Sequence, residues 1–183
     1  MASKNKHRRF FRSKDEERRI DSKLEELGKI ETKKLQNYLH KTYGINLDYL
    51  ESLALLKRGK DIWATNKSTK CMISIGKNLN INSLGIRILR NAFEVPKITT
   101  NFAILVNDKI TKNYYEMTKE QADEFTHGNE ISIPANNDYK NYLILKYNDE
   151  VYGVGLINNG TVKSQVPKGR LLKNKLEKEI DDS

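Results

Sequence analysis

The sequence predicts an α+β protein, with a small N-terminal α/β domain followed by a small mixed β-barrel. Three observations support this class. Apolar residues recur with helical spacing before Pro96, short strand-like runs dominate after it, and three such runs lie close together between residues 142 and 163. The expected organisation is a basic arm and leading helix over 1–27, the α/β domain over 28–97, the barrel domain over 98–176 and an acidic tail over 177–183.

The N-terminal part is expected to contain an arm, three helices and several strands. Residues 2–14 carry basic side chains, no acidic ones and few apolar ones, so they cannot offset the entropy cost of ordering, and a disordered arm is predicted. Helices are predicted over 15–29, 32–43 and 46–57, with Gly28, Gly44 and Gly59 as their ends and Asn46 as the N-cap of the third. Strands are expected at 61–65, 72–75 and 84–93.

Short strands and one helix are expected between Pro96 and the meander. The sequence predicts a strand at 102–106, a turn at 107–109 and a strand at 114–117. Thr118 is expected to cap a helix that ends at Gly128, followed by a strand at 131–133.

Residues 142–163 predict a three-stranded antiparallel meander. Runs rich in Tyr, Val, Ile and Leu occupy 142–147 and 151–157, with only three residues between them. The second turn falls at residues 158–160, and the third strand covers 161–163. Gly153 and Gly155 lie on one face of their strand, where another part of the chain is expected to approach closely.

Two motifs in this chain resemble a known RNA-binding domain. The stretch Y-G-V-G-L-I-N-N-G-T-V-K-S-Q-V-P-K-G-R, residues 152–170, is similar to the end of the PUA-like domain that follows the catalytic domain in rRNA cytosine-5 methyltransferases. The stretch S-L-G-I-R-I-L-R followed by P-K-I-T-T, residues 83–100, resembles the beginning of the same domain, with Ile98 inserted between the lysine and the threonines. The ordered pair of motifs covers residues 83–173.

The resemblance implies a PUA-like RNA-binding domain that stands here without the catalytic domain. It implies rRNA or tRNA as the partner, and a role in ribosome assembly or RNA modification. Because residues three apart on a regular strand point to opposite faces, only one of Arg87 and Arg90 is expected to join a given patch, and Arg87 is the candidate. The candidate RNA-binding residues are Arg87, Lys97, Lys163, Lys168, Arg170 and Lys173.

The composition favours a polyanionic partner. The chain of 183 residues has 33 Lys and Arg against 24 Asp and Glu, a net charge of +9. Its single cysteine, Cys71, permits no internal disulfide and no cysteine zinc site. Because there is no apolar stretch of membrane-spanning length and no secretory signal pattern, a cytoplasmic location and no membrane partner are expected.

No constellation for catalysis is visible in the sequence. His7, His40 and His127 are not spaced as metal ligands, and Cys71 lacks the proline that precedes the catalytic cysteine in the methyltransferases that the tail resembles. The P-loop and the G-x-S-x-G motif are missing, as is a glycine-rich turn for a methyl donor. No enzymatic activity, no cofactor and no metal are therefore expected.

Two alternatives remain open at this level. Trp63, Tyr147 and Tyr152 could stack on bases, although a position in the core is the favoured interpretation of each. The chain is expected to be a non-catalytic RNA-binding protein, and the alternative is an accessory subunit that docks onto an RNA-modifying enzyme through its N-terminal domain. An RNA-modifying enzyme and a ribosomal particle are the candidate protein partners.

Overall fold

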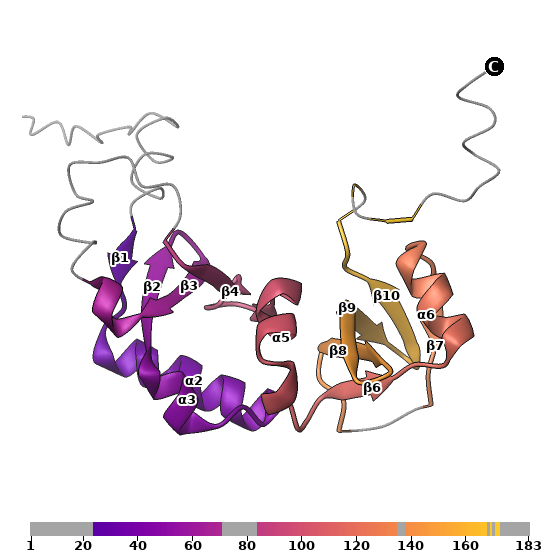
Figure 1. The fold of residues 1–183 in the computed structure, drawn as a ribbon, viewed down its shortest axis with the longest axis horizontal. Coiled ribbons are helices and arrows are strands. Elements are labelled where there is room, and N and C mark those ends of the chain that lie inside the picture. Colours follow the sequence, from indigo (N-terminus) through magenta and orange to yellow (C-terminus); the bar gives the residue numbers. More distant parts are fainter. Residues whose placement is uncertain (1–23, 71–83, 135–137, 168, 170, 173–183) are drawn as a thin grey trace, which may run out of the picture.

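The structure is a computed structural model that describes residues 24–70, 84–134, 138–167, 169 and 171–172. It contains two five-stranded sheets, and the short helix α5 (Thr100–Leu105) stands between them (Figure 1). The predicted arm and the acidic tail lie outside the described residues, as do the strand expected at 72–75 and Cys71. Helix α5 contacts β4 (Ile86–Arg90) of the first sheet and β9 (Glu150–Asn158) of the second.

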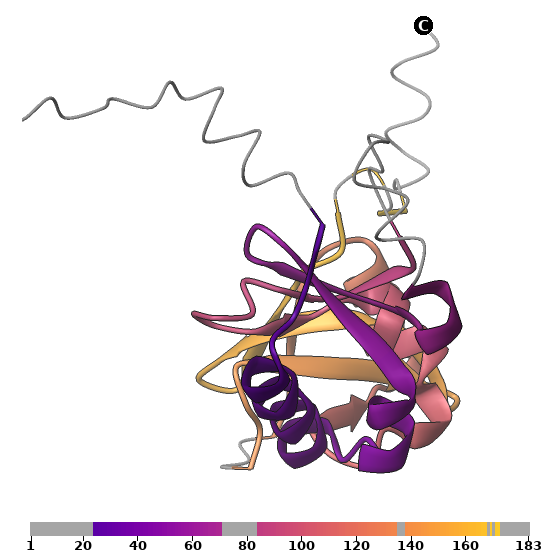
Figure 2. The same ribbon diagram turned by 90° about the vertical axis from the view of Figure 1, so that its left-hand side faces the viewer.

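The first sheet is antiparallel and follows the chain in order, β1-β2-β3-β4-β5. Helix α2 lies below its strands in Figure 2 and packs against one face together with α3. A short 3₁₀ turn, η1 (Lys67–Lys70), follows the third strand. The strands are β1 (Glu25–Glu26), β2 (Leu53–Arg58), β3 (Asp61–Asn66), β4 (Ile86–Arg90) and β5 (Lys97–Ile98), and the helices are α2 (Lys29–Tyr43) and α3 (Leu47–Ser52).

Local capping signals set several helix ends as predicted. Gly44 ends α2 in the left-handed conformation with φ 71°, and its N–H donates to the carbonyl of His40. The side chain of Asn46 caps α3 by accepting from the N–H of Asp48 at 2.7 Å. Gly28 lies before α2 and not at the end of a helix, and residues 25–26 form β1, so the leading helix predicted over 15–29 is wrong in its described part.

Two predicted elements have a different secondary structure from the one expected. The helix predicted through Lys57 ends at Ser52, because residues 53–58 pair along their whole length with β3. The strand predicted over 102–106 is instead α5, whose N-cap Thr99 accepts from the N–H of Phe102 at 3.3 Å. Phe102, Ala103 and Val106 are buried, which is the spacing of one helical face. The strand predicted over 84–93 is confirmed only as the shorter β4.

The second sheet has the order β6-β8-β9-β10-β7 and curls into a half-barrel. The predicted meander is confirmed as β8, β9 and β10, joined by two turns with positive φ at Asn148, Asp149, Asn159 and Gly160. Strand β6 is parallel to β8, and the other pairs are antiparallel. The elements are β6 (Tyr114–Glu116), α6 (Lys119–Thr126), β7 (Glu130–Ser132), β8 (Tyr142–Tyr147), β9 (Glu150–Asn158) and β10 (Thr161–Ser164), and η3 (Asn107–Lys109) is the predicted turn.

The two faces of the β8–β9 pair belong to different cores. Ile144 and Val154 join the large core that includes α2, the first sheet and α5. Leu143 and Leu145 face the opposite side, where they pack with Phe125 of α6. The first core therefore contains residues from both sheets, so the two halves share buried contacts. The boundary at residue 97 stays a prediction.

The predicted glycine face of β9 is the side that α6 covers. A Cβ at Gly155 would lie 2.2 Å from Cγ1 of Val162, and one at Gly153 would lie 2.8 Å from the ring of Phe125. Both positions therefore need glycine for close packing, as the sequence predicts.

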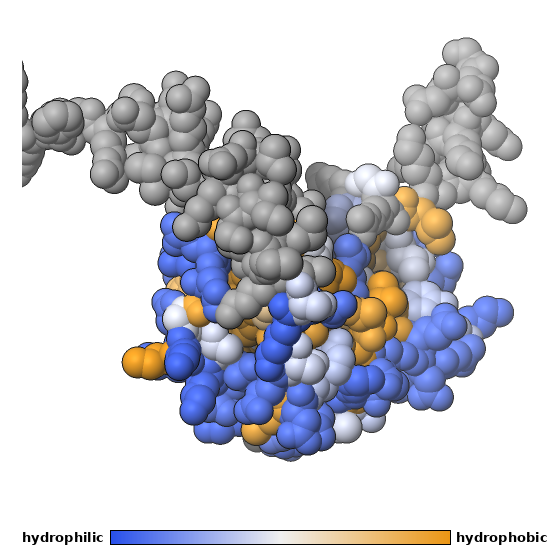
Figure 3. All heavy atoms as spheres, turned by 60° about the vertical axis from the view of Figure 1, so that its left-hand side comes forward, coloured by the Kyte–Doolittle hydropathy of each residue, from blue (hydrophilic) through white to orange (hydrophobic). Residues whose placement is uncertain are grey.

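The surface is mostly polar. On the face shown in Figure 3, hydrophilic residues cover most of the area and hydrophobic ones form smaller patches. No helix in the described part of the chain is long and apolar enough to cross a membrane.

Candidate nucleic-acid interface

A β-bulge in β4 places two arginines on the same side of the first sheet. Ile62 of β3 pairs with Leu89 and Trp63 pairs with Arg87, so β4 contains one extra residue at this point. Ile88 and Leu89 are consequently both buried in the large core. Arg87 and Arg90 then lie on the opposite face, and the prediction that only one of them could join a given patch is wrong. The strand is not regular, so the alternation on which that prediction relied does not hold.

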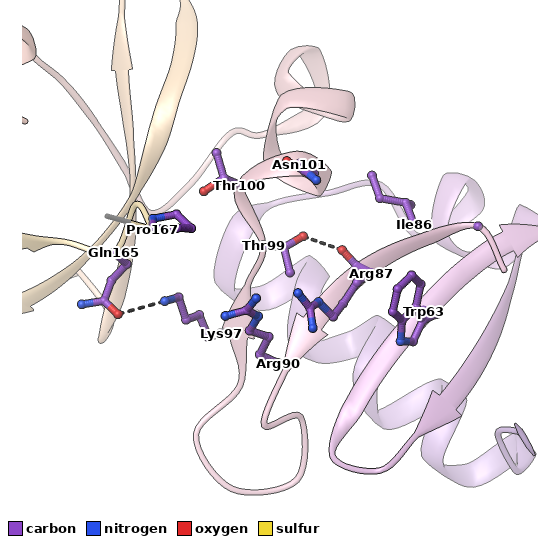
Figure 4. A pocket seen from close by; sticks show the side chains of 11 residues that line it. Trp63, Ile86, Arg87, Arg90, Lys97, Thr99, Thr100, Asn101, Gln165 and Pro167 are labelled. Atoms are coloured by element: carbon purple, nitrogen blue, oxygen red, sulfur yellow. Dashed lines mark hydrogen bonds between the residues drawn. The ribbon is translucent and has the colours of Figure 1, made fainter. Parts of the chain in front are cut away.

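This face forms one wall of a cavity of about 240 Å³. Arg87, Arg90 and Lys97 bring three cations to it, and none of the described residues that line it carries a carboxylate. Figure 4 shows the two guanidinium groups next to each other, between Trp63 and Lys97. The full lining is Trp63, Gly85, Ile86, Arg87, Arg90, Lys97, Thr99, Thr100, Asn101, Gln165 and Pro167.

Arg87 is fixed in place by two contacts. Its Nη1 lies 2.8 Å from Oδ2 of Asp61, and its guanidinium carbon lies 5.7 Å from the centroid of the Trp63 ring. The Arg87 carbonyl also accepts a hydrogen bond from the Thr99 hydroxyl (Figure 4). Because an ion pair and an aromatic ring both restrain it, the guanidinium offers a flat surface of defined orientation.

Arg90 and Lys97 are less well neutralised. They pair across β4 and β5, so their side chains start from adjacent positions on one face. Burial, and secondly the positive charge of Arg90, lower the pKa of Lys97 below its ordinary value of 10.5. Within the described residues no carboxylate pairs with either side chain, and Lys97 Nζ donates to Oε1 of Gln165 at 2.8 Å. An anion bound here would relieve the repulsion between the two cations.

The far wall of the cavity comes from the segment that follows β10. Gln165 extends the pairing with β9 through its N–H, which donates to the carbonyl of Val154 at 3.0 Å, and Pro167 lies two residues further on. Leu172 is tied back to α6 by a bond of 3.1 Å from its N–H to the carbonyl of Thr126. The tertiary fold thus brings the first and last sequence motifs to the same cavity.

The sequence-predicted site residues fall into three groups. Arg87 and Lys97 line the cavity. Lys163 lies on β10 outside the lining, with a side chain that is 68% exposed and 3.4 Å from Oε1 of Glu130. Lys168, Arg170 and Lys173 lie outside the described residues. The sequence also predicts that Arg87 and Lys97 form one phosphate-binding surface with Lys163, Lys168 and Arg170, and this stays a prediction.

Arg90, Trp63 and Gln165 line the cavity but were not in the predicted set. Arg90 was set aside because regular strand alternation was assumed, and the consecutive apolar pair Ile88-Leu89 between the two arginines was the available signal of a bulge. Trp63 is half-buried in the cavity wall and not in either core, so its favoured interpretation is wrong. Gln165 carried no distinguishing signal in the sequence.

The histidines and tyrosines considered from the sequence lie outside the cavity lining wherever the structure describes them. The Nδ1 atom of His40 lies 2.9 Å from the carbonyl of Ile45, and that of His127 lies 2.8 Å from the carbonyl of Asp123 at the end of α6. Tyr147 packs on the second core, whereas Tyr152 is 37% exposed, which contradicts a core position for it. Among the described residues, which do not include His7, no group of His, Cys, Asp and Glu is suited to hold a metal.

The second sheet lies in a region that is similar to a known domain. The family described as "Methyltransferase RsmF PUA domain" matches residues 112–172, which confirms the predicted resemblance. The ribosomal RNA small subunit methyltransferase F of Psychromonas ingrahamii is 27% identical over 129 residues, which is 67% of this chain and 26% of that protein. The chain therefore spans about a quarter of the length of the curated relative that it matches.

Proposed function

We propose that this chain, whose residues 112–172 form a PUA domain of the RsmF type, is a non-catalytic RNA-binding protein that acts on ribosomal RNA. The observation that carries the proposal is the cavity lined by Arg87, Arg90 and Lys97 without a carboxylate among its described residues. PUA domains bind RNA, and the name of the relative points to small-subunit rRNA as the substrate class. The cations would contact the phosphates, as is general in such interfaces.

The charge of the whole chain supports a polyanionic partner. The net charge of +9 raises the rate of encounter with RNA at low salt without selecting a sequence. Three of the basic residues line the cavity, and Asp61 pairs with Arg87 alone among them.

The test is binding of purified protein to fragments of small-subunit rRNA and to tRNA at several salt concentrations. We expect Arg90→Gln combined with Lys97→Gln to reduce the slope of log affinity against log salt by about 1.4, because two phosphate contacts are lost on single-stranded RNA. The matched control is Lys33→Gln with Lys34→Gln, two exposed lysines on α2, which packs against the opposite face of the first sheet. Equal slopes for the two double variants would contradict the proposal, and tighter binding to tRNA than to rRNA would overturn the choice of substrate.

The absence of catalysis is a separate part of the proposal. It rests on two observations. The sequence lacks a glycine-rich turn for a methyl donor, and the matched family model is that of the PUA domain. Incubation of purified protein with small-subunit rRNA and a labelled methyl donor should give no incorporation, with an active rRNA methyltransferase as the positive control. Incorporation that depends on this protein would overturn it.

A further inference from the structure

We infer that the cavity between the first sheet and the segment after β10 binds one unpaired nucleotide of the RNA, with its base on the surface formed by Trp63 and Arg87 and its phosphate on Arg90 and Lys97. This inference rests on the proposed function and deepens it, because it specifies which part of an RNA the cavity recognises. Four features of the cavity carry it.

The first feature is the mixed character of the wall. One part is aromatic or apolar, with Trp63, Ile86 and Pro167, and the adjacent part is cationic, with Arg90 and Lys97. A site that only neutralised phosphates would need no apolar wall. A nucleotide has both characters, since it combines a flat, largely apolar base with an anionic phosphate, and unpaired bases stack on aromatic rings and on arginine planes.

The second feature is the prearranged flat surface. Arg87 cannot swing freely, because Asp61 holds its Nη1 at 2.8 Å and the indole lies 5.7 Å from its guanidinium carbon. Since a guanidinium plane that is already oriented loses little entropy when a base stacks on it, Arg87 is suited to stacking more than to a flexible phosphate contact. In Figure 4 the Arg87 and Trp63 side chains lie together at one end of the group, with Lys97 at the other.

The third feature is the size of the cavity. About 240 Å³ lies below the range of roughly 300–1,000 Å³ for sites that hold a drug-sized molecule by themselves. A single nucleotide that belongs to a longer strand suits such a site, because the rest of the strand is held elsewhere on the protein. A double helix could not place a base there without unpairing it.

The fourth feature is the polar edge. Thr100 and Gln165 line the cavity beside the cations, and Oε1 of Gln165 accepts a hydrogen bond from Lys97 Nζ at 2.8 Å. Hydroxyl and amide groups at this edge can donate to a carbonyl or ring nitrogen of a base.

The experiment uses the sole tryptophan of the chain as its reporter. Two RNA hairpins with the same stem sequence are titrated into the full chain, one fully paired and one with a single bulged nucleotide, and both Trp63 fluorescence and anisotropy of a labelled RNA are recorded. We expect the bulged hairpin to quench Trp63 and to bind about 5- to 100-fold more tightly, which corresponds to one stacked base. The paired hairpin should bind with little change in the fluorescence of Trp63.

Variants separate stacking from charge. Trp63→Phe keeps a ring and should retain most of the preference for the bulged hairpin, whereas Trp63→Leu should abolish it. Because Trp63→Leu could also disturb the sheet, Arg90→Gln serves as the second variant, since Arg90 is exposed and its loss should weaken the bulged hairpin more than the paired one. Lys34→Gln, exposed on α2, should affect both hairpins equally.

The outcomes distinguish the two proposals. If neither hairpin nor rRNA fragments bind, the proposed function fails. If both hairpins bind with equal affinity and Trp63 fluorescence does not respond, the function stands and the inferred nucleotide site is overturned. If Arg90→Gln weakens the binding of both hairpins by the same factor, the cavity contacts phosphate only, and the inference is again overturned.

Discussion

The hydroxyl of Tyr43 donates a hydrogen bond of 3.2 Å to the backbone carbonyl of Tyr142, 99 residues further along the chain. Tyr43 ends α2 beneath the first sheet, and Tyr142 begins β8 of the second. The carbonyl of Tyr43 also accepts from the N–H groups of Thr111 and Lys112, at 3.1 and 3.2 Å. This fully buried tyrosine therefore joins the two sheets that hold the walls of the cavity.

Tyr43→Phe should lower the free energy of unfolding by about 0.5–1.5 kcal/mol, because the carbonyl of Tyr142 loses one of its two side-chain donors while the ring is kept; the other donor is Nδ2 of Asn113 at 2.8 Å. Urea denaturation at neutral pH measures it. The control is Tyr152→Phe, which removes a hydroxyl from a tyrosine that is 37% exposed and should change stability little. Equal effects of the two substitutions would show that the Tyr43 bond does not join the sheets energetically.

The same residue predicts a loss of stability at alkaline pH. Burial raises the pKa of Tyr43 well above its ordinary value of 10.0. Because the folded state holds this proton more tightly than the unfolded state, the contribution is complete below pH 10 and is lost as the pH rises above it. Urea denaturation from pH 8 to 11 should show a steeper decline for the wild type than for Tyr43→Phe. Parallel declines would assign the alkaline loss to other groups.

Gly155→Ala should destabilise the protein by about 1–3 kcal/mol, because the added methyl would overlap the side chain of Val162 on the neighbouring strand. Thermal unfolding measures the change. Gly169→Ala is the matched control, since nothing lies within 4 Å of a Cβ there. Adding Val162→Ala to Gly155→Ala should cost less than the sum of the single changes, because the two residues share one space. Additive effects would contradict the steric explanation.

Asp61→Asn tests whether the orientation of Arg87 matters more than its charge. The substitution removes a negative charge next to the cavity, so a purely electrostatic interface would bind every RNA more tightly. We expect the preference for a bulged hairpin over a paired one to fall several-fold, because Arg87 loses the ion pair of 2.8 Å that orients it. Anisotropy with both hairpins measures it, and an unchanged preference would show that Asp61 does not position Arg87 for binding.

The basic residues on and after β10 carry a prediction from the sequence alone. Changing Lys163, Lys168 and Arg170 together to Ala should reduce the slope of log affinity against log salt by about two units on single-stranded RNA, because about three phosphate contacts are lost. Lys163 is exposed on β10, so its loss should not unfold the protein. RNA affinity of the wild type and the triple variant is measured at several salt concentrations. An unchanged slope would show that these residues are solvated and do not contact phosphates.

Features that depend on neighbours in the chain were predictable from the sequence. The turns of the meander need residues that tolerate positive φ, and Asn148, Asp149, Asn159 and Gly160 stand at them. The caps Asn46 and Thr118 are found where a side-chain oxygen precedes a helix, the second within a complete capping box. These signals involve contacts within a few residues, so no knowledge of the rest of the fold is needed.

Tertiary contacts decided the short apolar runs and the cavity. Residues 53–58 and 100–105 are each compatible with helix or strand, and pairing with β3 made one a strand while burial of one face between the two sheets made the other a helix. The shared face of Arg87 and Arg90 exists only because β3 and β4 pair with a bulge. Gln165 and Lys97, 68 residues apart, meet because the second sheet packs against α5. Register and long-range packing, which set these contacts, depend on the partner segment as much as on the local sequence.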